Sequence, residues 1–212
     1  MGRAVIDGYF PGKDPVTSER IRQLEELYTY WNSRINVISR KDMANLYINH
    51  VLHSLSLSRI IPFRPGETAI DIGTGGGFPG IPLAILHPDV HFTLIDGTGK
   101  KIKVVENVVK ELNLKNVNAV HARAENFKGR FHFVLSRAVC SFSRLVELSG
   151  DKLIKGRSVS PEHGIYSFKG GEIVEELAQW REKVKIFNIE NYFSEEYFTK
   201  KHILFLPTQK LF

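Results

Sequence analysis

The chain has 212 residues, of which 42% are hydrophobic and 25% charged, an ordinary globular composition that suits one domain with a small extension. Its single cysteine, Cys140, excludes an intrachain disulfide, and no apolar stretch reaches the roughly 20 residues that span a bilayer. The N-terminus has no apolar run of signal-peptide length, so we expect a cytoplasmic protein. The net charge of +6 favours polyanionic partners, but only weakly on its own.

The first 65 residues predict a helical N-terminal extension. Residues 1–14 are rich in glycine and proline and show no period, which predicts an irregular arm. Over residues 17–35 and again over 42–60, apolar residues recur at steps of three and four, the pattern of an amphipathic helix. Two prolines, Pro62 and Pro65, end the second of these helices.

From residue 66 onward, short apolar runs alternate with helical stretches. The predicted strands cover residues 68–72, 91–95, 117–121, 131–136, 164–168, 184–189 and 202–206, and the predicted helices cover 81–86, 100–112, 142–154 and 171–182. Strands that alternate with helices form a parallel sheet covered on both faces. We therefore predict an α/β fold, with a doubly wound, mostly parallel sheet in one compact domain over residues 66–212.

The most informative segment is Asp71-Ile-Gly-Thr-Gly-Gly-Gly-Phe-Pro-Gly80, which joins the first predicted strand to a helix. Gly75, Gly77 and Gly80 satisfy the G-x-G-x-x-G pattern of a dinucleotide fold, in which a pyrophosphate lies against the helix N-terminus. This match is weak because a glycine-dense loop satisfies the pattern easily. Two prolines also remove backbone donors from the region, which argues mildly against a pyrophosphate.

The same segment fills the pattern acidic-x-Gly-x-Gly-x-Gly of an S-adenosylmethionine site, at Asp71, Gly73, Gly75 and Gly77. This cofactor has no phosphate. It carries a zwitterionic methionine end, a sulfonium and a ribose. An acidic side chain at the end of the strand suits cationic groups and would repel a pyrophosphate. Asp71 therefore favours an S-adenosylmethionine site over a dinucleotide site.

Two further acidic residues follow the next two predicted strands. Asp96 ends the second strand, where a ribose diol is held in either interpretation, and Glu125 follows the third, where with Ala124 it could frame an adenine. Taken singly, Asp96 and Glu125 are more simply explained as helix caps or turn formers. Three acids at the carboxyl ends of successive strands, where open α/β sheets bind ligands, favour a cofactor site.

Further segments carry a resemblance to a known family. They are Asn36-Val-Ile-Ser39 with His50 and Ser54-Leu55, the glycine turn with its continuation Gly-Phe-Pro-Gly-Ile-Pro82, Leu94-Ile-Asp96 with Lys100-Lys101, Ala122-Arg-Ala-Glu125, Leu135-Ser-Arg-Ala138 and Phe168-Lys-Gly170. In these segments, from about Trp31 to Gly171, the chain resembles the bacterial small-subunit ribosomal RNA guanine-N7 methyltransferases, also known as glucose-inhibited division protein B. It departs from that family at His53, where Asp is usual, and at Asn49, where Arg is common.

The resemblance implies a Rossmann-like class I S-adenosylmethionine-dependent methyltransferase that methylates N7 of a guanine in 16S ribosomal RNA. It also implies cofactor contacts at the positions matching Gly73, Phe78, Ala124, Glu125 and Arg137. It does not extend to the segment after about residue 172.

Transfer to guanine N7 needs no general base, because N7 has a free lone pair and no proton to lose, so catalysis rests on near-attack geometry. Arg137 follows the fourth predicted strand, and we expect it to position guanine O6, a phosphate or the cofactor. Alternatively, Arg137 forms a salt bridge to Asp71 or Glu125.

The segment after this strand lacks the Asn/Asp-Pro-Pro-aromatic motif of amino-group methylation. Cys140 lacks the context of a carbon-5 nucleophile, and we expect it to be packed.

Basic residues near the same sheet edge predict a phosphate-binding rim for RNA, formed by Lys100, Lys101, Arg123 and Lys169, although any single lysine is more simply a solvated side chain. His50 is expected to be a hydrogen-bonded core histidine, and no cluster has metal-ligand spacing. We expect a monomer that acts on 16S rRNA in the small ribosomal subunit, without a metal and away from membranes.

Three alternatives stay open from the residues alone. The protein could methylate a small molecule or a protein, in which case a basic rim would be dispensable. It could be a non-catalytic nucleotide-binding or RNA-binding module. An NAD-dependent oxidoreductase is a weaker candidate, because Asp71 and the lack of a Tyr-x-x-x-Lys element count against it.

Overall fold

The computed structural model describes residues 2–156 and 159–211. Its strands are β1 (Thr68–Ile72), β2 (His91–Asp96), β3 (Val117–His121), β4 (Phe133–Arg137), β5 (Gly164–Gly170), β6 (Lys185–Asn188) and β7 (Lys201–Pro207). Its α-helices are α1 (Ala4–Tyr9), α2 (Pro15–Asn32), α3 (His53–Leu55), α4 (Gly80–Leu86), α5 (Gly99–Glu111) and α6 (Phe142–Ser149). The π-helix η2 spans Leu46–Leu52, and the 3₁₀ turns are η1 (Met43–Asn45), η3 (Ser56–Arg59), η4 (Ile189–Asn191), η5 (Glu196–Phe198) and η6 (Thr208–Lys210).

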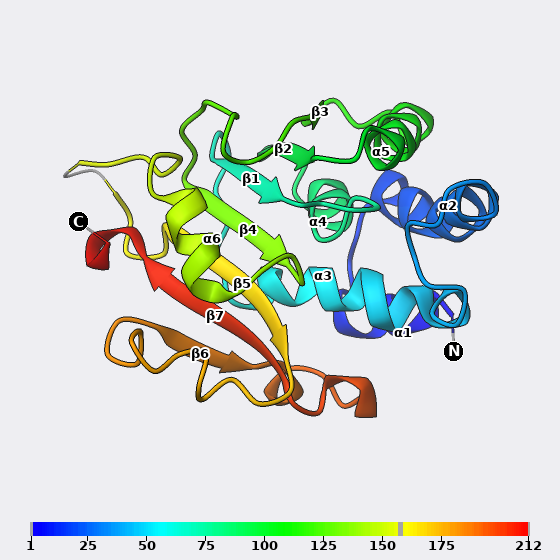
Figure 1. The fold of residues 1–212 in the computed structure, drawn as a ribbon. Helices are drawn as coiled ribbons and strands as arrows, with labels where there is room; N and C mark the ends of the chain where they lie inside the picture. Colours follow the sequence, from blue (N-terminus) through cyan, green and yellow to red (C-terminus); the bar gives the residue numbers. More distant parts are fainter. Residues whose placement is uncertain (1, 157–158, 212) are drawn as a thin grey trace.

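The seven strands form one sheet in the order β3-β2-β1-β4-β5-β7-β6 (Figure 1). Strands β1 to β5 run parallel, whereas β7 pairs antiparallel with both β5 and β6. This arrangement confirms the predicted α/β fold with a mostly parallel sheet. The strand order reverses at β1, which has β2 on one side and β4 on the other. Sheets of this kind bind ligands in the crevice outside the carboxyl ends of the strands at that point.

Alternate residues of β1 point to opposite faces of the sheet, and a hydrophobic cluster covers each face. Ala69 belongs to the cluster that includes α2, α4 and α5, whereas Ile70 and Ile72 belong to the cluster that includes α6. The first cluster also contains Tyr28 of α2, so the packing is continuous across residue 65. A boundary between an extension and a sheet domain at that residue stays a prediction.

Helix α2 connects the N-terminal region to the glycine turn. Asp14 caps the helix, because its carboxylate accepts hydrogen bonds from Val16 N at 2.9 Å and Thr17 N at 3.0 Å. Near its other end, the Tyr28 hydroxyl donates to the carbonyl of Gly76 at 2.6 Å. Figure 1 shows the N-terminal helices, in blue and cyan, beside α4 at one side of the sheet. None of the helices in the described parts of the chain is long and apolar enough to cross a membrane.

Two predictions were wrong, one for the N-terminal arm and one for the helix over residues 171–182. Residues 1–14 are not an irregular arm throughout, because Ala4–Tyr9 form α1 and bury Ile6 in the core. Residues 171–182 do not form a helix, and residues 174–183 form successive turns. The backbone bonds there mix spacings of three and four residues, and Glu176 is bonded to Lys169 and to the backbone of Phe142. Apolar periodicity alone did not reveal these competing bonds.

Two other predicted helices are present, but one is interrupted and the other is shorter than predicted. The stretch 42–60 is divided into a 3₁₀ turn, the π-helix η2, the short helix α3 and a second 3₁₀ turn. π-Helices are rare and often occur at functional sites. The predicted helix 142–154 ends at Ser149, because α6 is followed by a turn at Gly150 and a bridge from Leu153 to Phe131.

Replacing His87 with glutamine should make the free energy of unfolding less dependent on pH between about 4 and 6.5. Burial lowers the pKa of His87 from 6.5 to about 4, so the unfolded chain binds the proton more tightly than the folded chain does. The stability contributed by neutral His87 is therefore complete above pH 6.5 and is lost as the pH falls towards 4. Urea unfolding at pH 7 and pH 4.5 should show that His87→Gln removes on the order of 2 kcal/mol of this loss. Identical acid dependence in the two proteins would show that the pKa of His87 is not lowered.

Candidate functional site

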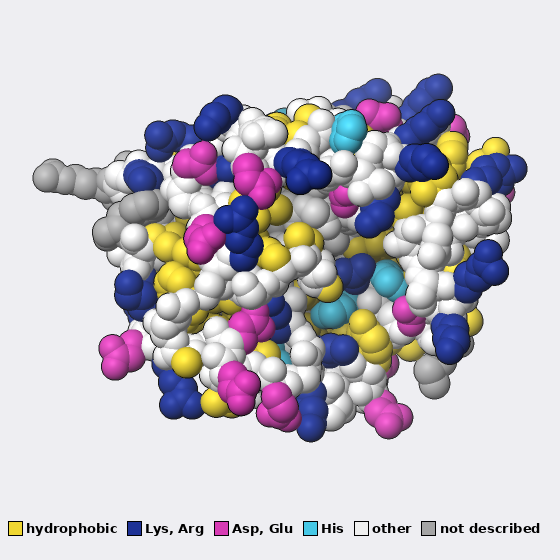
Figure 2. Space-filling view, viewed as in Figure 1, with side chains coloured by type: hydrophobic (Ala, Val, Ile, Leu, Met, Phe, Trp, Pro, Cys, Tyr) yellow, Lys and Arg dark blue, Asp and Glu magenta, His cyan; other side chains and the backbone are white. Residues whose placement is uncertain are grey.

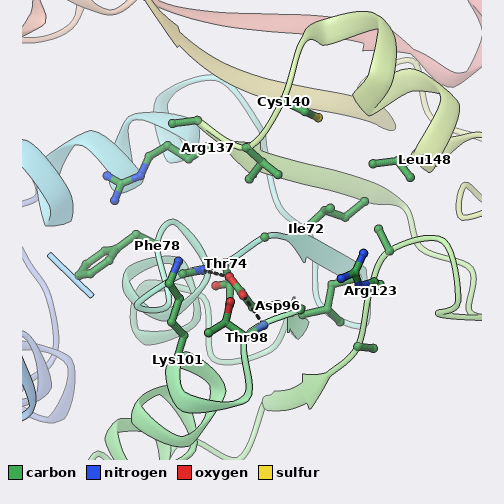
Figure 3. Close-up of a pocket in the computed structure, with 18 of the residues that line it drawn as sticks. Ile72, Thr74, Phe78, Asp96, Thr98, Lys101, Arg123, Arg137, Cys140 and Leu148 are labelled. Atoms are coloured by element: carbon green, nitrogen blue, oxygen red, sulfur yellow. Dashed lines mark hydrogen bonds between the residues drawn. The ribbon is translucent and has the colours of Figure 1, made fainter. Parts of the chain in front are cut away.

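A cleft of about 680 Å³ opens at the carboxyl ends of β1 to β4 (Figure 3). Its walls come from the glycine turn after β1, the ends of β2 and β3, the segment after β4 and helix α6. The volume lies in the range of about 300–1,000 Å³ that is usual for small-molecule sites. The position is the one that the strand order predicts for a ligand.

The glycine turn brings bare backbone to this cleft. Gly73 and Gly75 line it with φ values of +69° and +59°, in the left-handed region that favours glycine. A Cβ at Gly73 would lie 2.4 Å from Val139, whereas a Cβ at Gly75 would meet nothing within 4 Å. The space beside Gly75 is therefore open for a ligand to approach the backbone closely.

Asp71 lies beneath the turn rather than in the cleft. Its side chain is fully buried, and its Oδ2 accepts hydrogen bonds from Thr74 Oγ1 at 2.6 Å and from Gly80 N at 3.1 Å. Burial raises the pKa of Asp71 to about 6. The alternation of β1 explains this placement, since Asp71 points to the same face as Ala69, towards α4. The two hydrogen bonds show that Asp71 holds the turn in shape, while direct contact between Asp71 and a cofactor stays a prediction.

Gly77 likewise lies outside the cleft lining. A Cβ there would lie 2.4 Å from Ile81 of α4, so this glycine permits close packing between the turn and the helix. Phe78, the next residue, does line the cleft, although it is only 3% exposed.

Asp96 presents its carboxylate to the cleft at the end of β2. Its Oδ2 accepts a hydrogen bond from Gly75 N at 3.0 Å, and its Oδ1 accepts one from Thr98 N at 2.8 Å (Figure 3). A carboxylate has about four lone-pair sites, so both oxygens can accept a further bond. Asp96 therefore holds the glycine turn in place through Gly75, and its two carboxylate oxygens can also accept bonds from ribose hydroxyls.

Ala124 and Glu125 lie in the turn after β3 and both line the cleft. Ala124 is nearly buried, but Glu125 is exposed and forms a 2.8 Å ion pair with Arg144 of α6. Arg144 lines the cleft too and also pairs with Glu147. Glu125 therefore lies at the cleft, while its carboxylate already has a partner there.

A second pocket, of about 410 Å³, adjoins the cleft and is lined by Arg137 and Ala138, which also line the cleft. Its other walls come from η2, α3, the end of β5 and the segment near Tyr197. Ala138 has a φ of +56°, which is uncommon for a residue with a side chain. Backbone conformations of this kind concentrate at functional sites.

Arg137 lies at the junction of the two pockets. Its guanidinium donates to the carbonyl of Asn49 at 3.3 Å and contacts His50 Nδ1 at 2.9 Å, and its Cζ lies 5.1 Å from the centre of the Phe78 ring. Figure 3 shows Arg137 and Phe78 at one end of the cleft and Arg123 at the other. In the described part of the chain, no carboxylate lies within 4.0 Å of Arg137, so the alternative salt bridges to Asp71 and Glu125 do not form. Burial lowers the pKa of Arg137.

His50 is a hydrogen-bonded, partly buried histidine, as expected, but it also lines the second pocket. Burial lowers its pKa to about 4. Its Nε2 atom and that of the neighbouring His53 are buried without a hydrogen-bond partner among the described residues. These two ring nitrogens are therefore buried polar atoms that the described protein groups leave without a hydrogen bond.

The predicted basic rim is distributed over different surfaces. Lys101 and Arg123 line the first cleft, whereas Lys100 lines neither pocket. Lys169 lines the second pocket, and its ammonium donates to the carbonyl of Cys140 at 2.8 Å and to Glu176 at 2.5 Å. Figure 2 shows Lys and Arg side chains gathered at the edge that α5 occupies in Figure 1. Cys140 is only partly buried and lines the first cleft, and burial raises the pKa of its thiol, which disfavours a thiolate nucleophile.

Several lining residues of the second pocket had no predicted role. Asp42 was expected only as the start of a helix, and Tyr197 and Lys201 lie in the C-terminal segment that carries no recognisable motif. The hydrogen bond from the Tyr197 hydroxyl to the carbonyl of Asn49 joins residues 148 positions apart. The sequence analysis had singled out other residues of this lining, among them His50, Arg137 and Lys169, but did not predict that they share a pocket.

The chain matches a family model over residues 17–204, and the description of that model is rRNA small subunit methyltransferase G. The chain belongs to this family. It is 45% identical over 208 residues to the ribosomal RNA small subunit methyltransferase G of Porphyromonas gingivalis, covering 97% of this chain and 94% of the relative. It is 44% identical over 207 residues to the protein of that name in Christiangramia forsetii, covering 98% of each. Membership confirms the predicted resemblance.

The chain is also similar in fold to solved structures of other methyltransferases. The chain is similar to the T. thermophilus 16S rRNA N2 G1207 methyltransferase in complex with AdoMet and guanosine, with a TM-score of 0.53, 13% identity and coverage of 82% of this chain and 44% of that one. It is also similar to a coclaurine N-methyltransferase bound to N-methylheliamine and SAH, with a TM-score of 0.56, 12% identity and coverage of 84% and 67%. At such identities the likeness concerns the fold alone. The fold is the Rossmann-like fold of class I S-adenosylmethionine-dependent methyltransferases.

The cleft of this family member fits S-adenosylmethionine on two observations. The left-handed backbone at Gly75 leaves open space where a side chain would stand, and Asp96 offers carboxylate oxygens at the end of β2. Bare backbone suits close approach of the methionine end, and the carboxylate suits ribose hydroxyls rather than a phosphate.

Gly75→Ala is expected to weaken cofactor binding about tenfold or more. The added methyl group enters the open space of the cleft, and the left-handed φ costs about 1 kcal/mol for a residue with a Cβ. Isothermal calorimetry with S-adenosylmethionine measures the effect. Gly66→Ala is the matched control, because Gly66 also has a positive φ and open space but lies outside both pockets. Equal affinities in the two variants would mean that the ligand does not occupy the space beside Gly75.

Proposed function

We propose that this protein transfers the methyl group of S-adenosylmethionine to N7 of a guanine in 16S ribosomal RNA. The observation that carries the proposal is that two pockets meet at Arg137 and Ala138. The larger pocket suits the cofactor, and the smaller one offers a separate place for an acceptor. Membership of the rRNA small subunit methyltransferase G family supports ribosomal RNA as the acceptor class.

The residues around the second pocket suit an acceptor that has no proton to lose. When bound, the cofactor supplies an electrophilic methyl group on a sulfonium. Burial lowers the pKa values of His50 and His53, so both rings are neutral near pH 7, and Asp71 is sealed beneath the turn. Guanine N7 carries a lone pair and no hydrogen, so none of these groups has to act as a base. The reaction then depends on holding donor and acceptor in line, which is the role we assign to Arg137.

The proposal distributes roles among the predicted residues. Cofactor contacts fall to Gly73, Gly75, Phe78, Asp96, Ala124 and Glu125, while Asp71 and Gly77 maintain the shape of the turn. The RNA backbone is bound by Lys100, Lys101, Arg123 and Lys169. Among the residues that the structure describes, no group of three or more His, Cys, Asp or Glu side chains could hold a metal ion. We further propose that the protein acts as a monomer on the small ribosomal subunit in the cytoplasm.

The experiment that tests this function measures transfer of radiolabel from S-adenosylmethionine to ribosomal subunits from cells that lack the corresponding methyltransferase. We expect label in the small subunit and none in the large one. The transfer rate should fall steeply between 50 and 200 mM salt, because counterions compete with the basic side chains. Label in both subunits, or a rate indifferent to salt, would instead favour a different acceptor.

A further inference from the structure

The second pocket contains one carboxylate among the described residues that line it, that of Asp42. The other charged or titratable side chains of this lining are His50, His53, Arg137, Lys169, Tyr197 and Lys201. Asp42 is partly buried, and no cation lies within 4.0 Å of it in the described ranges. It does not line the cofactor cleft. The Asp42 carboxylate is therefore held by neutral hydrogen-bond donors and faces the pocket without a cationic partner.

Hydrogen bonds from Ser39 and Asn49 keep the Asp42 carboxylate ionised and oriented. The Ser39 hydroxyl donates to Oδ2 at 2.7 Å, and the Asn49 amide donates to Oδ1 at 3.0 Å. These bonds lower the pKa of Asp42, that from Ser39 most strongly. Since a carboxylate has about four lone-pair sites, each oxygen can still accept one bond from a ligand.

Asn49 also sets the order of the groups along the pocket wall. Its amide reaches Asp42, and its backbone carbonyl accepts the bond from Arg137. From the cofactor cleft along the pocket wall, the groups therefore follow in the order Arg137 at the junction, Asn49 and Asp42. Asn49 belongs to the π-helix η2 and lines the pocket, and π-helices often occur at functional sites.

We propose that Asp42 reads the Watson–Crick edge of the acceptor guanine, accepting bonds from N1–H and the N2 amino group while N7 faces the cofactor cleft. Around the guanine ring, the polar groups follow the order N7, O6, N1–H and N2 amino. The pocket wall matches this order with the cleft for N7, the Arg137 guanidinium for O6 and the Asp42 carboxylate for the two donors. The inference rests on the proposed function.

The same order of groups disfavours adenine. Adenine carries an amino group where guanine has O6 and an acceptor where guanine has N1–H, so it would oppose donors to the Arg137 donors and an acceptor to the Asp42 carboxylate. Unpaired polar groups in such a pocket lose their bonds to water without replacement. Asp42 and Arg137 together therefore act as specificity-determining residues for guanine.

A double-substitution experiment tests this role with the full chain. Small subunits are reconstituted with 16S rRNA in which the acceptor guanosine is replaced by inosine, which lacks the N2 amino group but keeps N7 and O6. The unaltered protein should lose about tenfold in kcat/KM on inosine, a loss typical of one missing base contact. Asp42→Asn should lose about tenfold or more on guanosine and clearly less on inosine, because inosine already lacks the bond to the N2 amino group and keeps only the N1–H bond to Asp42.

Asp89→Asn is the matched control, since Asp89 is an exposed carboxylate outside both pockets, and it should behave as the unaltered protein. Calorimetry should give the same S-adenosylmethionine affinity for all three proteins. If Asp42→Asn does not fold, Asp42→Glu replaces it, because an added methylene displaces the carboxylate and should also lower the preference for guanosine.

Equal use of guanosine and inosine by the unaltered protein would overturn the assignment of Asp42. Independent, additive losses from the two changes would overturn it as well. Failure of the proposed function is distinguishable from both, because the unaltered protein would then place no label on guanosine N7 in the unsubstituted subunit.

Discussion

Arg137→Ala is expected to lower kcat for methyl transfer by about 100-fold, with a much smaller effect on cofactor affinity. Arg137 lines both pockets and contacts Asn49, His50 and the face of the Phe78 ring. Its removal frees the acceptor to move relative to the methyl group, and a misplacement of about 1 Å can cost 100-fold in rate. Single-turnover kinetics with small subunits and labelled cofactor measure the change.

Two further variants separate positioning by Arg137 from its charge. Arg137→Lys keeps the charge but not the planar fork of donors, so it should recover only part of the lost rate. Arg181→Ala removes an exposed arginine that lines neither pocket and should leave the rate unchanged. A rate for Arg137→Ala close to that of Arg181→Ala would exclude Arg137 from the reaction.

Asp96→Ala should weaken S-adenosylmethionine binding by about 100-fold. The substitution removes the acceptors that we assign to the ribose hydroxyls, and it also leaves the backbone amides of Gly75 and Thr98 without their partner. Charge-assisted hydrogen bonds are about twice as strong as neutral ones, so two lost bonds account for this magnitude. Calorimetry gives the affinity directly.

Asp89→Ala serves as the control for loss of an acidic side chain, because Asp89 is exposed and lies outside the cleft. Circular dichroism should show that both variants keep the fold. Should Asp96→Ala bind the cofactor as tightly as Asp89→Ala does, the ribose is not held at the end of β2.

The central part of the fold was predictable because its signals are local. The buried strand β1 gives a short apolar run, the glycines mark a turn, and Asp96 ends the next strand at the position where ligands of parallel sheets are bound. Gly73, Gly75 and Asp96 line one cleft for these reasons, and their contacts with the cofactor stay a prediction. The direction of the Asp71 side chain was not foreseen, because it depends on which face of β1 packs against α4.

The second pocket was not predictable, because its walls are distant in the chain. Arg137 and Asn49 are 88 positions apart, and Tyr197 and Asn49 are 148 positions apart. No periodicity in the sequence reports such contacts. The turns over residues 174–183 escaped prediction for a related reason, since Glu176 bonds to Lys169 and Phe142, which lie in other elements.

The measurement that tests the central claim most directly locates the methyl group within the RNA. Small subunits from cells lacking the corresponding methyltransferase are incubated with this protein and labelled S-adenosylmethionine, and the 16S rRNA is then cleaved chemically at N7-methylguanine. We predict one labelled guanine and cleavage at that nucleotide alone. Label on another atom or on another class of molecule, with cofactor binding intact, would contradict methylation of guanine N7 while leaving the methyltransferase fold in place.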